Sequence, residues 1–245
     1  MTGDSKEIEV YRNPIVRLLD VEIGYKKTEP LVKIPNLEIF PGEIVAIAGP
    51  SGVGKTTLLR TIAGLVRPIS GSVEVCGAVS PCKPSKGILG YVPQRLGLIR
   101  HTSVMHNVMI GANAGHNKSL WSILPSSLAK KYASEAINSM GLSDKLREPI
   151  RRLSGGQQRR VATARTLAQR PSLIMADEFL SELDEDTMDM VLTAVTQYVR
   201  QSGAALLVVE HDVSRAKSMA DRLLVIDDGR VNPFITEATA MEVKI

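Results

Sequence analysis

The amino-acid sequence predicts an α/β fold in which helices cover both faces of a mainly parallel sheet. One observation is a glycine-rich loop at residues 49–57, which follows a short apolar run and precedes a helical pattern. The other is the alternation of apolar runs and helical patterns after residue 153, which is typical of parallel strands joined by helices. The later strands, predicted as buried on both faces, are 173–176, 204–209 and 223–227. Helices are predicted at 157–169, 187–201 and 213–219.

The composition is that of a globular protein. Of the 245 residues, 44% are hydrophobic and 23% are charged, and the net charge is +4. This length suits one large α/β domain or a core with an inserted subdomain. The polar N-terminus has no secretory signal and no apolar run approaches the roughly 18 residues of a membrane span, so we expect a cytosolic, soluble chain. Cys76 and Cys82 favour a reduced pair over a disulfide or a metal site.

The first part of the chain predicts several strands around the glycine-rich loop. Residues 1–13 are expected to form a loosely held tail. A helix is expected from the end of the loop to about Gly64, where a glycine suits the C-terminal cap. Strands are predicted at 15–21, 31–34, 37–39, 44–48, 72–76 and 88–92.

Residues 95–150 differ from the rest of the chain because helical spacing dominates and the alternation of strands and helices stops. This change predicts an inserted helical subdomain. Within it, the polar stretch at 111–119 contains glycine and predicts a loop, and Gly141 ends a helix. The apolar face of that helix is predicted to consist of Leu128, Tyr132, Ala136, Ile137 and Met140.

The loop at 49–57 has the spacing G-x-x-x-x-G-K-[ST] of a phosphate-binding loop. Glycines let the backbone curl so that several N–H groups point into one concavity, and the following helix adds the positive end of its dipole. Lys55 is expected to reach the terminal phosphates of a nucleotide, and the Thr56 hydroxyl to ligate Mg²⁺. The residues expected to hold nucleotide are Gly49, Pro50, Ser51, Gly52, Val53, Gly54, Lys55, Thr56 and Thr57.

Polar residues follow two of the buried strands, where the carboxyl ends of parallel strands form a ligand-binding edge. Asp177 is expected to hold Mg²⁺, and Glu178 to orient the attacking water or accept its proton; a surface acidic pair is the alternative. His211 follows the next strand and is expected to contact the γ-phosphate, although a lone histidine is more often structural. Gln94, where the helical block begins, is a candidate to sense the metal and the γ-phosphate.

A second candidate for anion binding is the stretch 153–160. Ser154 is placed to cap a helix, and Gln157 completes a capping box. This N-terminus is open to two interpretations, a well-capped helix or a site whose N–H groups and dipole attract phosphate. The residues concerned are Ser154, Gly155, Gly156 and Gln157.

From about residue 14 to residue 231, the ordered set of these motifs resembles the nucleotide-binding subunit of an ABC (ATP-binding cassette) transporter. The Ser-Gly-Gly-Gln sequence is discriminating, because other phosphate-loop ATPases lack it. The resemblance implies a single domain at 14–245 with a RecA-like P-loop NTPase core, an N-terminal antiparallel β subdomain and a helical subdomain at 95–156. The core segments are 14–94 and 157–232. It also implies an ATPase that uses ATP and Mg²⁺, with Tyr25 stacked on adenine and Gln94 beside the metal.

The resemblance further implies a head-to-tail dimer of two cassettes around two ATP molecules. Ser154, Gly155, Gly156 and Gln157 of one copy would contact the γ-phosphate bound to the other, and the stretch 181–184 would cross the interface. Dimer closure would act on a polytopic membrane permease at the cytoplasmic face of the membrane, and a cassette on its own chain favours an importer. A lipoprotein-release or cell-division module and a soluble regulatory ATPase are the alternatives.

Two features of the sequence qualify this interpretation. The family's usual Pro-Thr pair after the catalytic glutamate, and the small residue beyond it, are replaced by Phe179, Leu180 and Glu182, which puts the cross-interface geometry in question. A basic cluster suggests nucleic acid, but no aromatic residues are interleaved with it, so we expect a solvated face or a docking surface and no nucleic acid. The cluster consists of Arg147, Arg151, Arg152, Arg159, Arg160 and Arg165.

Overall fold

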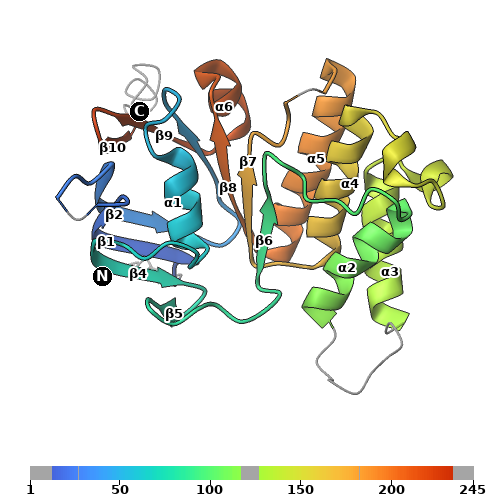
Figure 1. Ribbon diagram of the computed structural model, residues 1–245, viewed down its shortest axis with the longest axis horizontal. Coiled ribbons are helices and arrows are strands. Elements are labelled where there is room, and N and C mark those ends of the chain that lie inside the picture. Colours follow the sequence, from blue (N-terminus) through green and yellow to red (C-terminus); the bar gives the residue numbers. More distant parts are fainter. Residues whose placement is uncertain (1–12, 27, 117–126, 182, 234–245) are drawn as a thin grey trace, which may run out of the picture.

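A computed structural model describes residues 13–26, 28–116, 127–181 and 183–233. Within these ranges, ten strands form one continuous sheet in the order β5-β4-β1-β2-β10-β9-β3-β8-β7-β6. Figure 1 shows helix α1 beside the antiparallel half of the sheet and helices α2 to α5 gathered beside the parallel half. The proposed tail at 1–13 lies almost entirely outside the described residues, as does 234–245. The domain boundaries therefore stay a prediction.

The parallel half of the sheet is the core of the fold. Strands β3, β7 and β8 are buried at every residue, and Ala46 of β3 lies between Val208 and Leu223 of its two neighbours. Successive residues of β3 enter different hydrophobic clusters, Ile44 on one face and Val45 on the other, so both faces are covered as predicted. The strands of this half are β3 (Ile44–Ala48), β6 (Leu89–Val92), β7 (Leu173–Asp177), β8 (Ala205–Glu210) and β9 (Arg222–Asp227).

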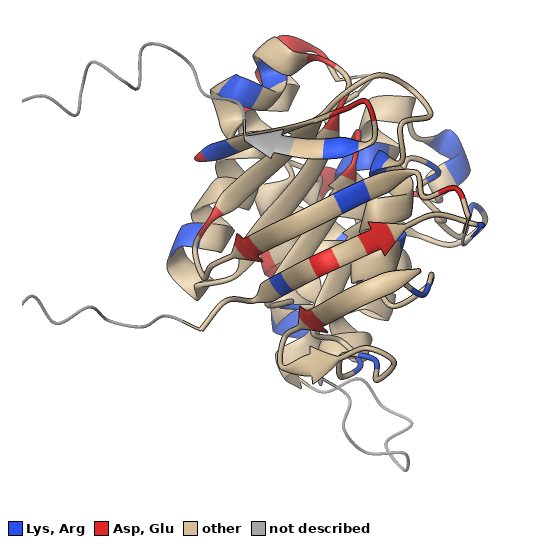
Figure 2. Cartoon of the chain, turned by 90° about the vertical axis from the view of Figure 1, so that its left-hand side faces the viewer, with Lys and Arg blue, Asp and Glu red and all other residues tan. Residues whose placement is uncertain are grey.

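In the other half of the sheet, strands β1, β2, β4 and β5 pair antiparallel and present one face to solvent, whereas β10 pairs with β2 in parallel. Cross-strand ion pairs line this face, with Arg17 Nε 2.8 Å from Glu38 Oε1 and Lys33 Nζ 2.8 Å from Glu22 Oε1. Figure 2 shows positions of basic residues (blue) and acidic residues (red) along these strands. Strand β10 pairs with both β9 and β2 and joins the two halves. The strands here are β1 (Val16–Ile23), β2 (Val32–Ile39), β4 (Ser70–Val75), β5 (Ala78–Val79) and β10 (Arg230–Pro233).

The helices follow the predicted order, with the inserted pair α2 and α3 packed against α4 (Figure 1). Two short 3₁₀ helices, Ser143–Lys145 and Ile150–Arg152, connect α3 to α4. Among the described residues, no helix combines the length and the apolar character needed to cross a bilayer. The helices are α1 (Lys55–Ile62), α2 (Val104–His116), α3 (Ser127–Ser139), α4 (Gly155–Ala168), α5 (Glu185–Ser202) and α6 (Val213–Met219).

The predicted loop at 111–119 is wrong for residues 111–116, which belong to α2; residues 117–119 lie outside the described ranges. The glycines serve close packing here. A Cβ at Gly111 would lie 2.0 Å from the main-chain oxygen of Arg165, and one at Gly115 would lie 2.0 Å from that of Gln169. These two glycines, one helical turn apart, let α2 approach α4 more closely than any side chain would allow.

The predicted apolar face of α3 is wrong at one position, because Leu128 is 45% exposed. The buried side chains of this helix are mostly alanines, Ala129, Ala133 and Ala136, with Ile137 beside them. Small residues face inward because α3 packs closely against α2 and α4. Cys76 and Cys82 are both free thiols, in agreement with the expected reduced pair.

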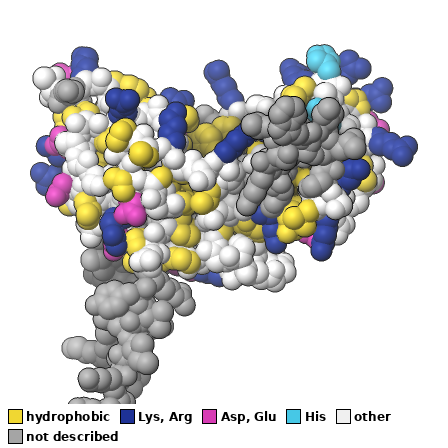
Figure 3. Space-filling view, turned by 90° about the horizontal axis from the view of Figure 1, so that it is seen from below, with side chains coloured by type: hydrophobic (Ala, Val, Ile, Leu, Met, Phe, Trp, Pro, Cys, Tyr) yellow, Lys and Arg dark blue, Asp and Glu magenta, His cyan; other side chains and the backbone are white. Residues whose placement is uncertain are grey.

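The basic cluster divides into two groups. Arg147, Arg151 and Arg152 are exposed as expected. Arg159 is only 4% exposed, and Arg165 donates from its guanidinium to the main-chain oxygens of Leu96 and Gly97, so the solvated-face interpretation is wrong for these two residues. Seen from the amino ends of the parallel strands, Lys and Arg side chains project around the rim of the molecule, with hydrophobic side chains in separate groups between them (Figure 3).

Candidate functional site

The predicted site residues converge at the carboxyl edge of the parallel strands. The chain leaves β3 into the glycine-rich loop, leaves β7 at Asp177 and Glu178, and leaves β8 at His211, so three adjacent strands deliver polar groups to one place. A pocket of about 330 Å³ opens there. Its lining consists of Tyr25, Leu31, Ser51, Gly52, Gly54, Lys55, Thr56, Thr57, Gln94, Asp177, Glu178 and His211.

The loop between β3 and α1 requires glycine at two positions. Gly49 has φ 152° and a Cβ there would lie 2.5 Å from the main-chain oxygen of Ile226, while Gly54 has φ 111° and a Cβ would lie 2.7 Å from Val32 Cγ2. The loop therefore closes against the sheet with no room for side chains at these two positions, as the tight backbone of a phosphate cradle requires. Val53 does not line the pocket, because its side chain packs against the hydrophobic core.

Lys55 lies at the start of α1 with its ammonium turned back across the loop. Its Nζ donates to the main-chain oxygens of Gly49 at 2.6 Å and Pro50 at 2.8 Å, and lies 3.4 Å from His211 Nδ1. The residue is 5% exposed, and burial lowers the pKa of its ammonium against the raising effect of Glu178 and Asp177. A buried cation held at the mouth of an anion cradle is well placed to meet phosphate oxygens.

Thr56 and Asp177 form the candidate magnesium site. The Thr56 hydroxyl donates to Asp177 Oδ2 at 3.1 Å, and burial raises the pKa of that carboxyl, which is 5% exposed. Within the described ranges, no group of three or more His, Cys, Asp or Glu side chains could hold a metal. One carboxylate with a hydroxyl still fits Mg²⁺, because this ion is usually held by one or two protein carboxylates together with phosphate oxygens and water.

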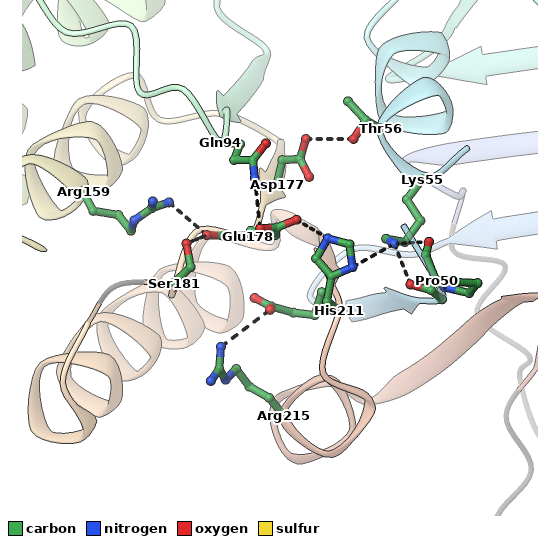
Figure 4. A network of polar contacts seen from close by, with 12 residues as sticks. Pro50, Lys55, Thr56, Gln94, Arg159, Asp177, Glu178, Ser181, His211 and Arg215 are labelled. Atoms are coloured by element: carbon green, nitrogen blue, oxygen red, sulfur yellow. Dashed lines mark hydrogen bonds and ion pairs between the residues drawn. The ribbon is translucent and has the colours of Figure 1, made fainter. Parts of the chain in front are cut away.

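Glu178 lies at the centre of a polar network that Figure 4 shows. Its Oε2 accepts from Gln94 Nε2 at 3.2 Å and its Oε1 lies 2.5 Å from His211 Nε2. His211 therefore bridges Glu178 on one side and Lys55 on the other, through its two ring nitrogens. This arrangement places a carboxylate, an imidazole and an ammonium along one wall of the pocket.

Tyr25 lies at the rim of the pocket and is 70% exposed. Its hydroxyl is 3.3 Å from Thr57 Oγ1, and this hydrogen bond lowers the pKa of the phenol. An exposed aromatic ring beside a phosphate cradle offers a flat surface on which a base can stack.

The Ser154 group does not join this pocket. Ser154 caps α4 by accepting from the Gln157 N–H at 3.2 Å, and its own N–H donates to Gln157 Oε1 at 3.0 Å, which confirms the predicted capping box. Ser154 and Gly155 are exposed, and none of the four residues 154–157 lines the pocket. One chain therefore carries two separate candidate phosphate sites.

The unusual pair after Glu178 has a structural explanation. Phe179 and Leu180 are each 1% exposed and belong to the hydrophobic core, so they anchor the segment that follows Glu178. Asp184 caps α5 by accepting from the Thr187 N–H at 2.9 Å. Glu182 lies outside the described residues.

Sequence reasoning missed three polar residues near the pocket: Arg159 and Ser181, which donate to the main-chain oxygen of Glu178, and the 2% exposed Glu210. A signal for Arg159 existed, because it lies on the same helical face as the buried residues Ala162, Thr163 and Thr166. Glu210 is the last residue of the apolar strand β8, and its position at the end of a fully buried strand is the signal for its burial.

The comparisons with known proteins agree with this site. A family profile described as "ABC transporter" matches residues 32–181. The lipoprotein-releasing system ATP-binding protein LolD of Zymomonas mobilis is 34% identical over 233 residues, which cover 89% of this chain and 95% of that protein. The L-cystine transport system ATP-binding protein TcyN of Escherichia coli is 37% identical over 207 residues, 80% of each chain.

Solved structures show the same architecture. A dimeric ATP-binding cassette in a post-hydrolysis state with bound ADP and Pi aligns with a TM-score of 0.75 and 31% identity. The match covers 89% of this chain and 96% of the cassette. The likeness extends well beyond the glycine-rich loop and includes the antiparallel strands and the inserted helices.

Proposed function

The chain belongs to the ABC transporter family and is an ATPase of that family, and on this premise we propose that it works as the MgATP-driven motor of a transporter, with each active site shared between two copies. One observation carries the proposal. The pocket gathers a triphosphate cradle and the groups for hydrolysis, while the second phosphate-binding helix end of the same chain faces solvent elsewhere.

Each pocket residue has a role in this proposal. The loop amides and Lys55 would neutralise charge on the β- and γ-phosphates, and Tyr25 would stack on adenine. Thr56, Asp177 and the Gln94 amide oxygen would hold Mg²⁺, which supplies charge neutralisation on the phosphate oxygens when bound.

The hydrolytic step falls to Glu178 and His211. The Glu178 carboxylate would orient a water for in-line attack on the γ-phosphorus and accept its proton. His211 would contact the γ-phosphate and, through its bond to Glu178, fix the angle of that carboxylate. Little covalent chemistry is required of the protein, because positioning and charge neutralisation carry most of the rate.

The Ser154 end of α4 would complete the site of a second copy. The N–H groups and the helix dipole at this end suit a γ-phosphate. The four residues 154–157, however, do not line the pocket of their own chain. In a head-to-tail dimer, the Ser154 end of each copy would meet the nucleotide in the pocket of the other copy. The dimeric cassettes among the solved structures support this arrangement.

The membrane partner is proposed from the relatives. Several are named as ATP-binding proteins of import or release systems, so we place this chain at the cytoplasmic face of a membrane, bound to a polytopic permease. An importer remains the first candidate. A lipoprotein-release role is the second, because the LolD relative is matched over 95% of its length, whereas a methionine import relative is matched over 59%.

The shared-site proposal is tested with Glu178→Gln, which keeps the side-chain volume but removes the base. We expect this variant to bind ATP and to accumulate as an ATP-bound dimer, measured by size-exclusion chromatography with light scattering at saturating ATP and Mg²⁺. A Glu178→Gln protein that stays monomeric under these conditions would contradict the proposal. Co-purification of a polytopic membrane protein from native membranes tests the transport role, and its identity decides between import and release.

A further inference from the structure

Arg159 connects the two phosphate-binding regions of the chain. It lies in the second turn of α4, is 4% exposed, and donates from Nη1 to the main-chain oxygen of Glu178 at 2.9 Å. Figure 4 shows its guanidinium reaching from α4 to the segment that carries Glu178. The contact joins residues 19 apart in sequence and on different elements.

The main chain of Glu178 needs this support. Its φ of 53° lies in the left-handed region, which costs a residue with a side chain on the order of 1 kcal/mol. Four hydrogen bonds hold the strained conformation. The N–H donates to Val209 O at 3.0 Å, and the carbonyl oxygen accepts from Arg159 Nη1 at 2.9 Å, from Ser181 Oγ at 2.8 Å and from the Ser181 N–H at 3.2 Å. This backbone conformation directs the carboxylate toward Gln94 and His211.

A buried acid, Glu210, also interacts with Arg159 electrostatically. The buried carboxylate of Glu210, at the end of β8, is attracted by the positive charges of Arg159 on α4 and Arg215 on α6, and repelled by Glu178 and Asp212. Arg215 Nη1 lies 3.9 Å from Glu210 Oε2. Burial raises the pKa of Glu210 to about 7, so this acid is not a permanent counter-charge, and the position of Arg159 rests on its hydrogen bond to Glu178.

The helix that carries Arg159 begins at Ser154, roughly one and a half turns earlier. Its capping box closes the first turn of α4 with two hydrogen bonds, and the Ser154 end and Arg159 belong to one continuous helix. We therefore expect the Arg159 guanidinium to move together with the Ser154 end when that end meets a phosphate.

We propose that Arg159 is a positioning residue that couples the two ATP sites of the dimer: it ties the alignment of Glu178 in its own pocket to the position of the helix whose Ser154 end meets the ATP of the other copy. This inference rests on the proposed function. It assigns to Arg159 a role in the cooperativity of ATP hydrolysis and no contact with ATP.

The test compares Arg159→Met with Arg160→Met. Arg160 is the neighbouring arginine, and it also donates to main-chain oxygens, but those of Met140 at 3.0 Å and Gly141 at 3.4 Å, away from Glu178. We expect Arg159→Met to lower kcat about tenfold with KM for ATP changed by less than about twofold. The Hill coefficient should fall from about 2 toward about 1, while Arg160→Met leaves both quantities near wild type.

Further variants keep the test decisive. Arg159→Lys, which retains a positive donor, should give intermediate kcat and Hill values, and it replaces Arg159→Met if that protein does not fold by circular dichroism. Wild-type cooperativity in the Arg159 variants, or the same loss in Arg160→Met, would overturn the inference.

Failure of the proposed function is recognised separately. In the Glu178→Gln background, Arg159→Met should still form the ATP-bound dimer, because Arg159 does not contact nucleotide. If Glu178→Gln alone does not dimerise, the shared-site proposal falls and this inference with it. If it dimerises and Arg159→Met hydrolyses ATP with normal cooperativity, only the inference on Arg159 falls.

Discussion

The two phosphate-binding regions of this chain are built in opposite ways. In the pocket, Lys55 and Asp177 are each 5% exposed, and the polar groups bond to one another across four segments of the chain. At the N-terminus of α4, Ser154 is exposed, and its hydrogen bonds are those of its own capping box. The pocket is preorganised within one chain, whereas the Ser154 end is a complete helix cap that lacks a ligand from the same chain. The difference supports the proposal that the second region contacts another molecule.

The largest effect is expected at the exposed region. Ser154→Arg places a bulky charged side chain where a partner's γ-phosphate would lie, and we expect ATP turnover to fall on the order of 100-fold. ATP binding to the isolated chain, measured by fluorescence titration, should change by less than about twofold, because Ser154 is outside the pocket.

Ser143→Arg is the matched control, since Ser143 is an exposed serine of the same helical region, bonded to Asn138. Equal losses in both variants would mean that a new arginine anywhere on this subdomain disturbs the fold. Loss of nucleotide affinity in Ser154→Arg would mean that the two regions are not separate.

A smaller effect is expected from the buried charge beside the pocket. Burial raises the pKa of Glu210 from its ordinary value of 4.5 to about 7, so the folded state holds this proton more tightly than the unfolded chain. The free energy of unfolding should therefore fall as pH rises from about 4.5 to about 7. Glu210→Gln keeps the neutral form at every pH and removes this loss.

Urea unfolding of both proteins measures the effect. Between pH 5.5 and pH 8, the stability of Glu210→Gln relative to wild type should increase on the order of 2 kcal/mol. A difference that does not change with pH would show that Glu210 is ionised at both values or that its counter-charges offset its burial.

The smallest effect is expected at the exposed rim of the pocket. Removing the Tyr25 ring takes away a stacking surface but leaves the phosphate cradle intact, so Tyr25→Ala should raise KM for ATP about threefold with little change in kcat. Tyr25→Phe keeps the ring and loses only the bond to Thr57, and it should behave like wild type. A fall in kcat for both variants would assign Tyr25 a role other than stacking.

The contrast also explains which parts the sequence predicts well. Asp177 ends one buried strand, His211 directly follows a second, and Lys55 comes after the glycine-rich loop that leaves a third, so their meeting at one edge follows from parallel topology. The capping box at Ser154 is equally local, because it depends on residues three apart. Both regions are therefore visible in the sequence, and the structure agrees with the expectation that they do not meet within one chain.

The errors concern residues whose place depends on how helices pack. Arg159 was grouped with exposed arginines, but the rotation of α4 turns it inward to Glu178. Gly111 and Gly115 favour a loop in the sequence, because sequence alone does not distinguish a glycine that permits a turn from one that permits close helix packing. Leu128 was assigned to a buried face that small alanines occupy instead. Long-range packing decides each of these cases, and only for Arg159 does the helical spacing carry a local signal.

The most direct test of the shared active site mixes two inactive variants. Lys55→Met loses the cradle of its own chain and Ser154→Arg loses the helix end offered to the partner, so each alone should be inactive. In an equal mixture, half of the dimers pair one copy of each, and such a dimer has one intact site. If the sites are shared, ATPase activity should return, to at most about a quarter of wild type. If each site lies within one chain, both variants stay inactive when mixed, and that result would contradict the account.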